Sequence, residues 1–154
     1  MPADNAESEK VYRLLYFSRA HLENTPNPDQ AFHEILGLAR KNNAKRGITG
    51  CLLACNGWFL QILEGGRENV QITFETIRCD PRHENVVVVK AANTPARTFP
   101  FWSMCGQLLS PTDDAIVRTL ENGDIFDASK LVPPQAVTLL KRIQFLQEWQ
   151  PGPS

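Results

Sequence analysis

The most restrictive feature of the sequence is an uncharged segment, Gly47–Leu63, which the dipeptide Asn56-Gly57 divides in two. Asn-Gly strongly favours a two-residue turn between antiparallel strands, so the segment predicts a β-hairpin with strands at Ile48–Cys55 and Trp58–Glu64. The turn and the polar Gln61 argue against a membrane-spanning helix. Both strands carry apolar side chains on both faces, so the fold must cover this hairpin from two sides.

Length and composition are those of one ordinary globular domain. The chain has 154 residues, of which 42% are hydrophobic and 21% charged, and its formal net charge is −1. Without a basic excess, we expect no general binding to nucleic acid or to a membrane surface. The polar N-terminus lacks the apolar core of a secretory signal, so we expect a cytoplasmic protein. The cysteines form no CxxC pair and the histidines lack zinc-ligand spacing, which predicts reduced thiols and no metal site.

Hydrophobic periodicity predicts the element order β-α-β-β-α-β-β, followed by C-terminal helices. Asn27-Pro28 marks a helix start, and the apolar repeat continues to Asn42-Asn43, where we expect the helix to stop. The consecutive valines of Val86–Ala92 predict a strand buried on both faces. The order is that of an α+β, ferredoxin-like βαββαββ sheet with two helices on one face. The remaining elements are predicted at Val11–Phe17, Arg67–Cys79, Phe101–Leu109, Pro111–Glu121 and Pro133–Trp149.

Strand parity sorts the predicted sheet into two faces, because side chains two residues apart point the same way. Tyr16 and Gln61 are assigned to one face, as a hypothesis from parity and strand order. Trp102 and Met104 are predicted to share a face of the last strand. The other face of the hairpin is too apolar to meet water, so we expect the C-terminal helices to cover it; its residues include Leu53, Trp58, Leu60 and Ile62.

Three polar features within these apolar runs have plain structural explanations when each is taken alone. Gln61 could be satisfied at a strand edge, Tyr16 could be a core tyrosine with a bonded hydroxyl, and Asn42-Asn43 could be a helix stop. A buried amide group left without a partner costs about 1–3 kcal/mol. Gln61 is therefore the residue that most requires an explanation, and the three features gain meaning only in combination.

Several short motifs occur in a fixed order between residues 11 and 109. They are Leu15-Tyr16-Phe17-Ser18, Asn42-Asn43-Ala44 with Gly47-Ile48-Thr49-Gly50, Phe59-Leu60-Gln61-Ile62-Leu63-Glu64-Gly65, Asp80-Pro81-Arg82-His83, and Phe99-Pro100-Phe101-Trp102-Ser103-Met104. In this order and spacing they resemble the motifs of BLUF domains, which are blue-light sensors that use flavin. The fold predicted from periodicity agrees with this resemblance independently.

The resemblance implies a flavin, usually FAD and with FMN left open, held non-covalently between the two helices. Ile35 and Ile77 would then sandwich the ring, and Asn43, helped by Asn42, would bond its pyrimidine edge. Arg82 would face the carbonyl side of the ring or the phosphates. The same resemblance places further contacts at the entrance of the site, namely Asp80 and His83, and a phosphate contact at Lys41, for which a solvated surface lysine is an equal alternative.

The resemblance also implies a photochemical role for two residues. In this family the tyrosine that matches Tyr16 gives an electron to the light-excited flavin, and a proton moves through the glutamine that matches Gln61. The glutamine is left with changed hydrogen bonds, by rotation or by tautomerisation. Trp102 and Met104 would carry the change toward the C-terminal helices, although ordinary core packing explains these two residues equally well.

The expected organisation is a flexible tail at 1–10, the flavin-binding sensor at 11–109, a helical extension at 110–149 and a second tail at 150–154. We expect a short, stand-alone sensor without enzymatic activity, acting through a homo-oligomer, a separate effector protein or both. Two alternatives remain open. One is an acylphosphatase-like enzyme, disfavoured because no glycine-bearing phosphate loop follows the first strand; the other is a ferredoxin-like regulatory or dimerisation module without a cofactor.

Overall fold

The Asn56-Gly57 turn organises the sheet of the computed structural model. Both residues have positive φ, 52° and 77°, as a two-residue hairpin turn requires. The turn joins β2 (Thr49–Cys55) to β3 (Trp58–Gly65), with Cys55 opposite Trp58. The predicted hairpin is therefore confirmed.

The structure describes residues 10–22, 25–100, 102–110, 112–120 and 125–149. Apart from Lys10, the predicted tails at 1–10 and 150–154 lie outside the described residues. Phe101 and Pro111, which begin two of the predicted elements, also lie outside them. The other elements, in chain order, are β1 (Val11–Ala20), α2 (Pro28–Arg46), α3 (Arg67–Arg78), β4 (His83–Thr94), β5 (Cys105–Leu109), α4 (Asp114–Val117), the short 3-10 helix η1 (Ala128–Lys130) and α5 (Pro133–Trp149).

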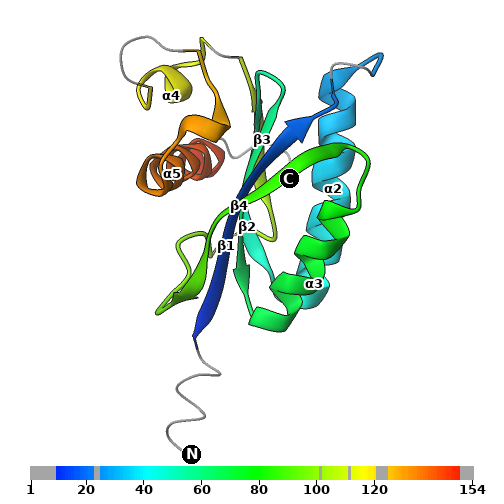
Figure 1. Cartoon of the computed structure of the whole chain (residues 1–154), viewed down its shortest axis with the longest axis vertical. Coiled ribbons are helices and arrows are strands. Elements are labelled where there is room, and N and C mark those ends of the chain that lie inside the picture. The colour runs from blue at the N-terminus through cyan, green and yellow to red at the C-terminus, as the bar shows by residue number, and fades with distance from the viewer. Residues whose placement is uncertain (1–9, 23–24, 101, 111, 121–124, 150–154) are drawn as a thin grey trace, which may run out of the picture.

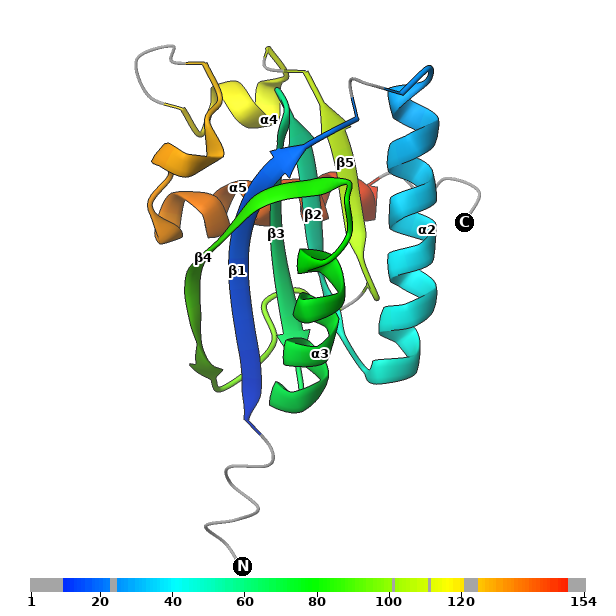
Figure 2. The same ribbon diagram turned by 45° about the vertical axis from the view of Figure 1, so that its right-hand side comes forward.

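The five strands form one sheet in the order β4-β1-β3-β2-β5. Neighbouring strands are antiparallel except β2 and β5, which are parallel. Helices α2 and α3 lie on one side of the sheet, and α4 and α5 lie on the other (Figures 1 and 2). The predicted three-layer α+β arrangement is confirmed, and β3 occupies its centre.

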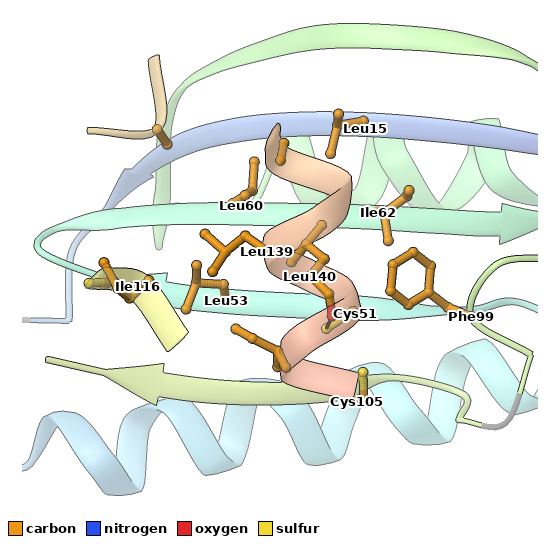
Figure 3. Packing of buried hydrophobic residues seen from close by; sticks show 14 of the residues in the cluster. Leu15, Cys51, Leu53, Leu60, Ile62, Phe99, Cys105, Ile116, Leu139 and Leu140 are labelled. Atoms are coloured by element: carbon orange, nitrogen blue, oxygen red, sulfur yellow. Dashed lines mark hydrogen bonds between the residues drawn. The ribbon is translucent and has the colours of Figure 1, made fainter. Parts of the chain in front are cut away.

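Two apolar clusters fill the spaces between these layers. The cluster under α2 and α3 includes Tyr16, Phe32, Leu52, Phe59 and Leu63, as the parity of the hairpin predicts. The opposite cluster is covered by α5, which crosses the strands over the buried side chains of the sheet (Figure 3). Its members include Leu15, Leu53, Leu60, Ile62, Leu139, Leu140 and Ile143. The C-terminal helix is therefore part of the sheet's core.

The predicted burial of the valine-rich strand on both faces is wrong. Within the described residues, strand β4 is an edge strand that pairs with β1 alone, and Val87 and Val88 are 45% and 44% exposed. Consecutive valines favour an extended backbone whatever the depth of the strand. Their burial depends on the strand order, which local composition does not encode.

The predicted end of the first helix at Asn42-Asn43 is also wrong. Helix α2 continues to Arg46 and ends at Gly47, which adopts a left-handed conformation with φ of 64°. Glycine reaches that conformation without steric cost, whereas asparagine only tolerates it. Asn43 is consequently a buried residue inside the helix, with its side chain directed to a tertiary partner.

The last strand begins later than predicted, and its two signalling candidates do not share a face. Strand β5 starts at Cys105, so Trp102 and Met104 lie in the irregular segment before it. Met104 is fully buried in the cluster under α2 and α3, whereas Trp102 packs against the cluster under α5. Strand parity does not apply to a segment that is not extended.

A buried carboxylate fastens this irregular segment to the sheet. Glu64, at the end of β3, is fully buried and accepts hydrogen bonds from the backbone N–H groups of Thr98 and Phe99, at 2.9 and 2.7 Å. The Arg13 Nε atom on β1 donates to the same carboxylate at 2.8 Å. Arg97 adds bonds to the carbonyls of Glu64 and Gly47. These contacts join the β4–β5 connection to the centre of the sheet.

Replacing Glu64 with alanine should destabilise the fold strongly. The substitution leaves the Arg13 guanidinium, the buried Phe99 N–H and the partly buried Thr98 N–H without their acceptor, and the expected loss in free energy of unfolding is about 3 kcal/mol. Urea unfolding measures it. The matched control is Glu75→Ala, which removes an exposed ion pair to Arg78 and should cost less than about 0.5 kcal/mol. Equal losses in the two variants would contradict this account of Glu64.

Candidate functional site

A cavity lies between α2 and α3, above the face of the sheet that carries Tyr16 and Gln61. Helix α2 contributes side chains at intervals of three and four residues, so they form one stripe along the helix. Helix α3 and the loop after it contribute the facing wall. The residues of α2 that line the cavity are Ile35, Leu38, Ala39, Asn42, Asn43 and Arg46, and those of the facing wall are Thr73, Thr76, Ile77, Asp80, Arg82 and His83.

The floor of the cavity holds a buried tyrosine and a buried glutamine in direct contact. Tyr16 on β1 and Gln61 on β3 are opposite each other in the antiparallel register. The Tyr16 hydroxyl donates a hydrogen bond to Gln61 Oε1. Tyr16 is fully buried and Gln61 is 3% exposed. The sheet thus holds a phenol and a carboxamide together, away from water, on the face that the sequence hypothesis requires.

The amide nitrogen of Gln61 has a sulfur atom as its hydrogen-bond partner. Gln61 Nε2 lies 3.3 Å from Met104 Sδ, within hydrogen-bonding range for sulfur. A thioether is a weak acceptor, so this bond holds the amide less firmly than an oxygen would. The amide is therefore anchored at its oxygen end by Tyr16 and only lightly restrained at its nitrogen end.

Burial governs the ionisation of Tyr16. It raises the pKa of the hydroxyl well above its usual value, and the negative charge of Asp80 raises this pKa further. The edge of the Phe74 ring packs on the Tyr16 ring, with the centroids 5.5 Å apart. Tyr16 is consequently a neutral phenol whose proton points at a single acceptor, Gln61.

The polar end of the cavity is built from the turn after α3. Arg82 Nε donates to both carboxylate oxygens of Asp80, at 3.0 and 3.1 Å, and the Arg82 backbone N–H donates to the same carboxylate. The Arg82 hydrogen bonds are the main reason that the pKa of Asp80 is lowered. His83 Nδ1 lies 2.8 Å from Ser18 Oγ, and its ring packs on Phe59. Burial lowers the pKa of His83 to about 4, so this histidine is neutral near pH 7.

Helix α2 also connects the cavity to the irregular segment before β5. Asn43 Nδ2 donates to the Ser103 carbonyl at 2.9 Å, and Arg40 Nε donates to the Met104 carbonyl at 2.7 Å. The bond to Ser103 leaves Asn43 Oδ1 and one amide hydrogen for a ligand. Asn43 therefore belongs both to the cavity and to the support of Met104.

The structure brings together nearly all the residues predicted for the site. Ile35, Asn42, Asn43, Gln61, Ile77, Asp80, Arg82 and His83 all line the cavity. Tyr16 does not line it but lies beside Gln61 on the neighbouring strand and bonds to it. Lys41 does not line it and is exposed on α2.

Sequence reasoning missed several lining residues that share the helical stripes. Leu38, Arg46, Thr73 and Thr76 line the cavity, and Arg46 Nη1 donates to Thr73 Oγ1 at 3.2 Å. The signal that would have identified them is helical spacing: Arg46 follows Asn42 and Asn43 by four and three residues, Thr73 precedes Ile77 by four, and Thr76 follows Thr73 by three. Ala39 also lines the cavity.

The sequence matches the model of a known protein family. A family model described as BLUF, sensors of blue-light using FAD, matches residues 11–105, which is more than half of the chain. This chain belongs to the BLUF family. The matched region contains the cavity, Tyr16, Gln61 and Met104.

Curated BLUF relatives are much longer proteins. The blue light- and temperature-regulated antirepressor BluF of Escherichia coli (strain K12) is 35% identical over 86 residues, which cover 56% of this chain and 21% of BluF. The photoactivated adenylate cyclase subunit beta of Euglena longa is 31% identical over 98 residues, which cover 64% of this chain and 11% of the cyclase subunit. The chain therefore matches only a small part of the length of these relatives.

Two solved structures match most of the chain. The photo-activated state of BlsA has a TM-score of 0.77 at 27% identity, covering 87% of this chain and 94% of BlsA. The dark state of the BLUF protein BlrB has a TM-score of 0.69 at 28% identity, covering 91% and 98%. Because these matches extend beyond the family region, they include the C-terminal helical layer. The ferredoxin-like fold of this chain is thus that of known BLUF proteins.

The cavity fits a flavin in the chemistry of its walls. Apolar side chains from α2 and α3 face one another, as a flat aromatic ring requires, and the wall also carries amide and guanidinium groups that could bond the carbonyl and N–H groups of such a ring. The cavity measures about 80 Å³, below the roughly 300–1,000 Å³ of ligand sites. Binding an isoalloxazine therefore requires side chains of α2 and α3 to move apart.

The described part of the chain offers neither a metal centre nor a membrane anchor. Its His, Cys, Asp and Glu side chains form no group of three or more that could bind a metal ion. None of its helices combines the length and the apolar character needed to cross a membrane. The residues that line the cavity between α2 and α3 all lie within the region that the family model matches.

His83 should make the stability of the protein depend on pH. Its pKa is about 4 in the fold, against about 6.5 for a free histidine, so between these values only the unfolded chain takes up the proton. The free energy of unfolding should therefore fall as the pH decreases, by about 2 kcal/mol between pH 7 and pH 5 from this residue. Urea unfolding of wild type and His83→Gln isolates the contribution as the difference between their pH profiles.

The control for this experiment is His33→Gln, because His33 is exposed on α2. The His33→Gln profile should run parallel to that of wild type, whereas the His83→Gln profile should be flatter. Parallel profiles for wild type and His83→Gln would show that His83 is not held neutral by burial.

Proposed function

We propose that this BLUF protein binds FAD between α2 and α3 and senses blue light through the pair formed by Tyr16 and Gln61. The observation that carries the proposal is the buried hydrogen bond from the Tyr16 hydroxyl to Gln61 Oε1 at the floor of the cavity. Any hydrogen-bond acceptor would satisfy the hydroxyl of a tyrosine with a purely structural role. The acceptor of Tyr16 is instead the amide of Gln61, which is itself part of the cavity wall. One solved relative, Klebsiella pneumoniae BlrP1, is described with FMN, so FMN is the alternative cofactor.

The proposed binding residues divide by chemistry. Ile35 and Ile77 hold the two faces of the ring, and Asn43, assisted by Asn42, bonds its polar edge. Arg82, oriented by Asp80, supplies positive charge for a ring carbonyl or for phosphate, and His83 closes the same end. Lys41 is proposed only as a phosphate contact outside the cavity, because the dinucleotide tail of FAD extends beyond the ring.

The photochemical step follows from the state in which the fold holds Tyr16. When bound, the flavin supplies light absorption and accepts an electron. Tyr16 is the oxidisable group nearest to Gln61, and loss of an electron makes its hydroxyl proton strongly acidic. That proton already points at Gln61 Oε1. A primary amide can accept a proton at oxygen and release one from nitrogen, so Gln61 can relay it and change its hydrogen bonds.

The proposed output begins at the lightly held end of Gln61. Turning or tautomerising the amide alters its bond to Met104 Sδ, and the Met104 backbone is held by Arg40 of α2. Two residues away, Trp102 packs against the cluster under α5. A displacement of this segment therefore reaches the C-terminal layer, from which we propose that the signal passes to a second copy or to a separate effector protein.

Substituting the phenol tests the proposal directly. Tyr16→Phe should retain the flavin but lose the reversible red shift of its absorption band under blue light, because no proton remains for Gln61. The matched control is Tyr12→Phe, which removes a hydroxyl from the same strand four residues away, where the ring lies 5.3 Å from the Arg67 guanidinium. That variant should keep the shift. An unaltered shift in Tyr16→Phe would remove Tyr16 from the mechanism.

Substituting the amide of α2 tests the binding site. Asn43→Ala should weaken flavin binding about tenfold, the loss expected for one or two hydrogen bonds. Fluorescence titration of the flavin-free protein measures the dissociation constant, and thermal unfolding shows whether the lost bond to Ser103 disturbs the fold. Lys41→Ala should leave FMN affinity unchanged and weaken only FAD if the lysine contacts the outer phosphate. Unchanged flavin affinity in Asn43→Ala would contradict the proposed site.

A further inference from the structure

A second and larger cavity lies on the opposite side of the sheet, where the beginning of α5 faces β1 and β4. Its volume is about 470 Å³, within the roughly 300–1,000 Å³ typical of small-molecule sites. Arg13 and Leu15 enter it from β1, Lys90 from β4, and Val137 and Lys141 from α5. None of these five residues belongs to the flavin site.

The wall of this cavity is cationic on one part and apolar on another. Three basic side chains line it, Arg13, Lys90 and Lys141, and no acidic side chain does. Neither lysine has a carboxylate partner among the described residues. The apolar part consists of Leu15, Val137 and the two prolines that begin α5. Such a wall would attract an anion and shelter a hydrocarbon group.

The backbone explains why the basic groups converge. The pairing of β1 with β4 shifts register between Leu15 and Tyr16, so β4 carries one extra residue and Lys90 lies opposite Leu15. Lys90 therefore lies on the α5 side of the sheet, like Leu15. Val88 lies on the other side, like Tyr16, although the two β4 residues are only two positions apart. On α5, Val137 and Lys141 are one helical turn apart and share one face. Two elements thus present a lysine to the same space.

We propose that this cavity binds an amphipathic organic anion, a carboxylate attached to an aliphatic chain. The carboxylate would lie between Lys90 and Lys141, and the chain would lie against Leu15 and Val137. Charge alone would admit any anion, and the apolar wall alone would admit any hydrocarbon. The combination selects molecules that carry both groups.

The cavity is connected to the Met104 segment through Arg13. Its guanidinium donates from Nε to the buried Glu64 carboxylate and from Nη2 to Thr98 Oγ1, and Glu64 in turn holds the Thr98 and Phe99 backbone. An anion near Arg13 would compete with Glu64 for this cation. Anion binding would in this way be coupled to the light-induced change in the Met104 segment. This coupling rests on the proposed function, whereas binding of the anion in the dark does not.

Isothermal titration calorimetry of the flavin-loaded protein in the dark tests the cavity with three probes. Octanoate carries both features, octanamide lacks the charge, and acetate lacks the chain. Octanoate should bind about tenfold or more tightly than either of the others. Lys90→Gln combined with Lys141→Gln should weaken octanoate about tenfold, whereas the charge-matched control Lys45→Gln combined with Lys130→Gln should not.

The outcomes separate the possibilities. Octanamide binding as tightly as octanoate, acetate binding equally well, or equal octanoate affinity in the two double variants would each overturn the proposal. A repeat titration under continuous blue light tests the coupling, which predicts a changed octanoate affinity and, reciprocally, a changed lifetime of the shifted spectrum with octanoate. If the protein shows no light-induced shift, the proposed function fails, and the dark titration still decides the cavity.

Discussion

The rest of this structure depends on the hydrogen bond from Tyr16 to Gln61, because two buried polar side chains must meet across neighbouring strands. Both partners lie in the middle of a sheet and away from water, where an unpaired polar group costs about 1–3 kcal/mol. Their contact depends on the register that places Tyr16 opposite Gln61. That register brings the central strand and β1 together, and α2 and α3 enclose the pair from above.

Much of the fold could be predicted because its signals are local. The Asn56-Gly57 turn determines the hairpin pairing, and alternation along β2 and β3 then sorts their side chains between two helical layers. Predictions failed where the answer depends on distant parts of the chain. The exposure of Val87 and Val88 follows from the edge position of β4. The end of α2 is a different, local case, because Gly47 in the left-handed conformation ends the helix and Asn42-Asn43 do not.

The site divides in the same way. Ile35, Asn42 and Asn43 were predicted from the motif resemblance, and the helical spacing that is compatible with their grouping extends to Arg46. The motif resemblance supplied the chemistry, which spacing does not contain. What neither supplied is the placement of Met104 and Trp102 in opposite clusters, because this placement depends on an irregular segment whose path is determined by Glu64, Arg97 and Arg40.

The central position of β3 explains how a change at one side chain can reach both sides of the sheet. Gln61 faces the cavity between α2 and α3, while its neighbours Leu60 and Ile62 are buried in the cluster under α5. A rearranged amide can shift a partner's equilibrium only through contacts that differ between the two states. The closely packed aliphatic neighbours of Gln61 leave little freedom to move, whereas the Met104 segment is held by a few directional bonds. In the proposed mechanism we therefore expect that segment to carry most of the difference between the states, and the buried Glu64 carboxylate, which joins it to Arg13, would extend the same connection to the opposite face of the sheet.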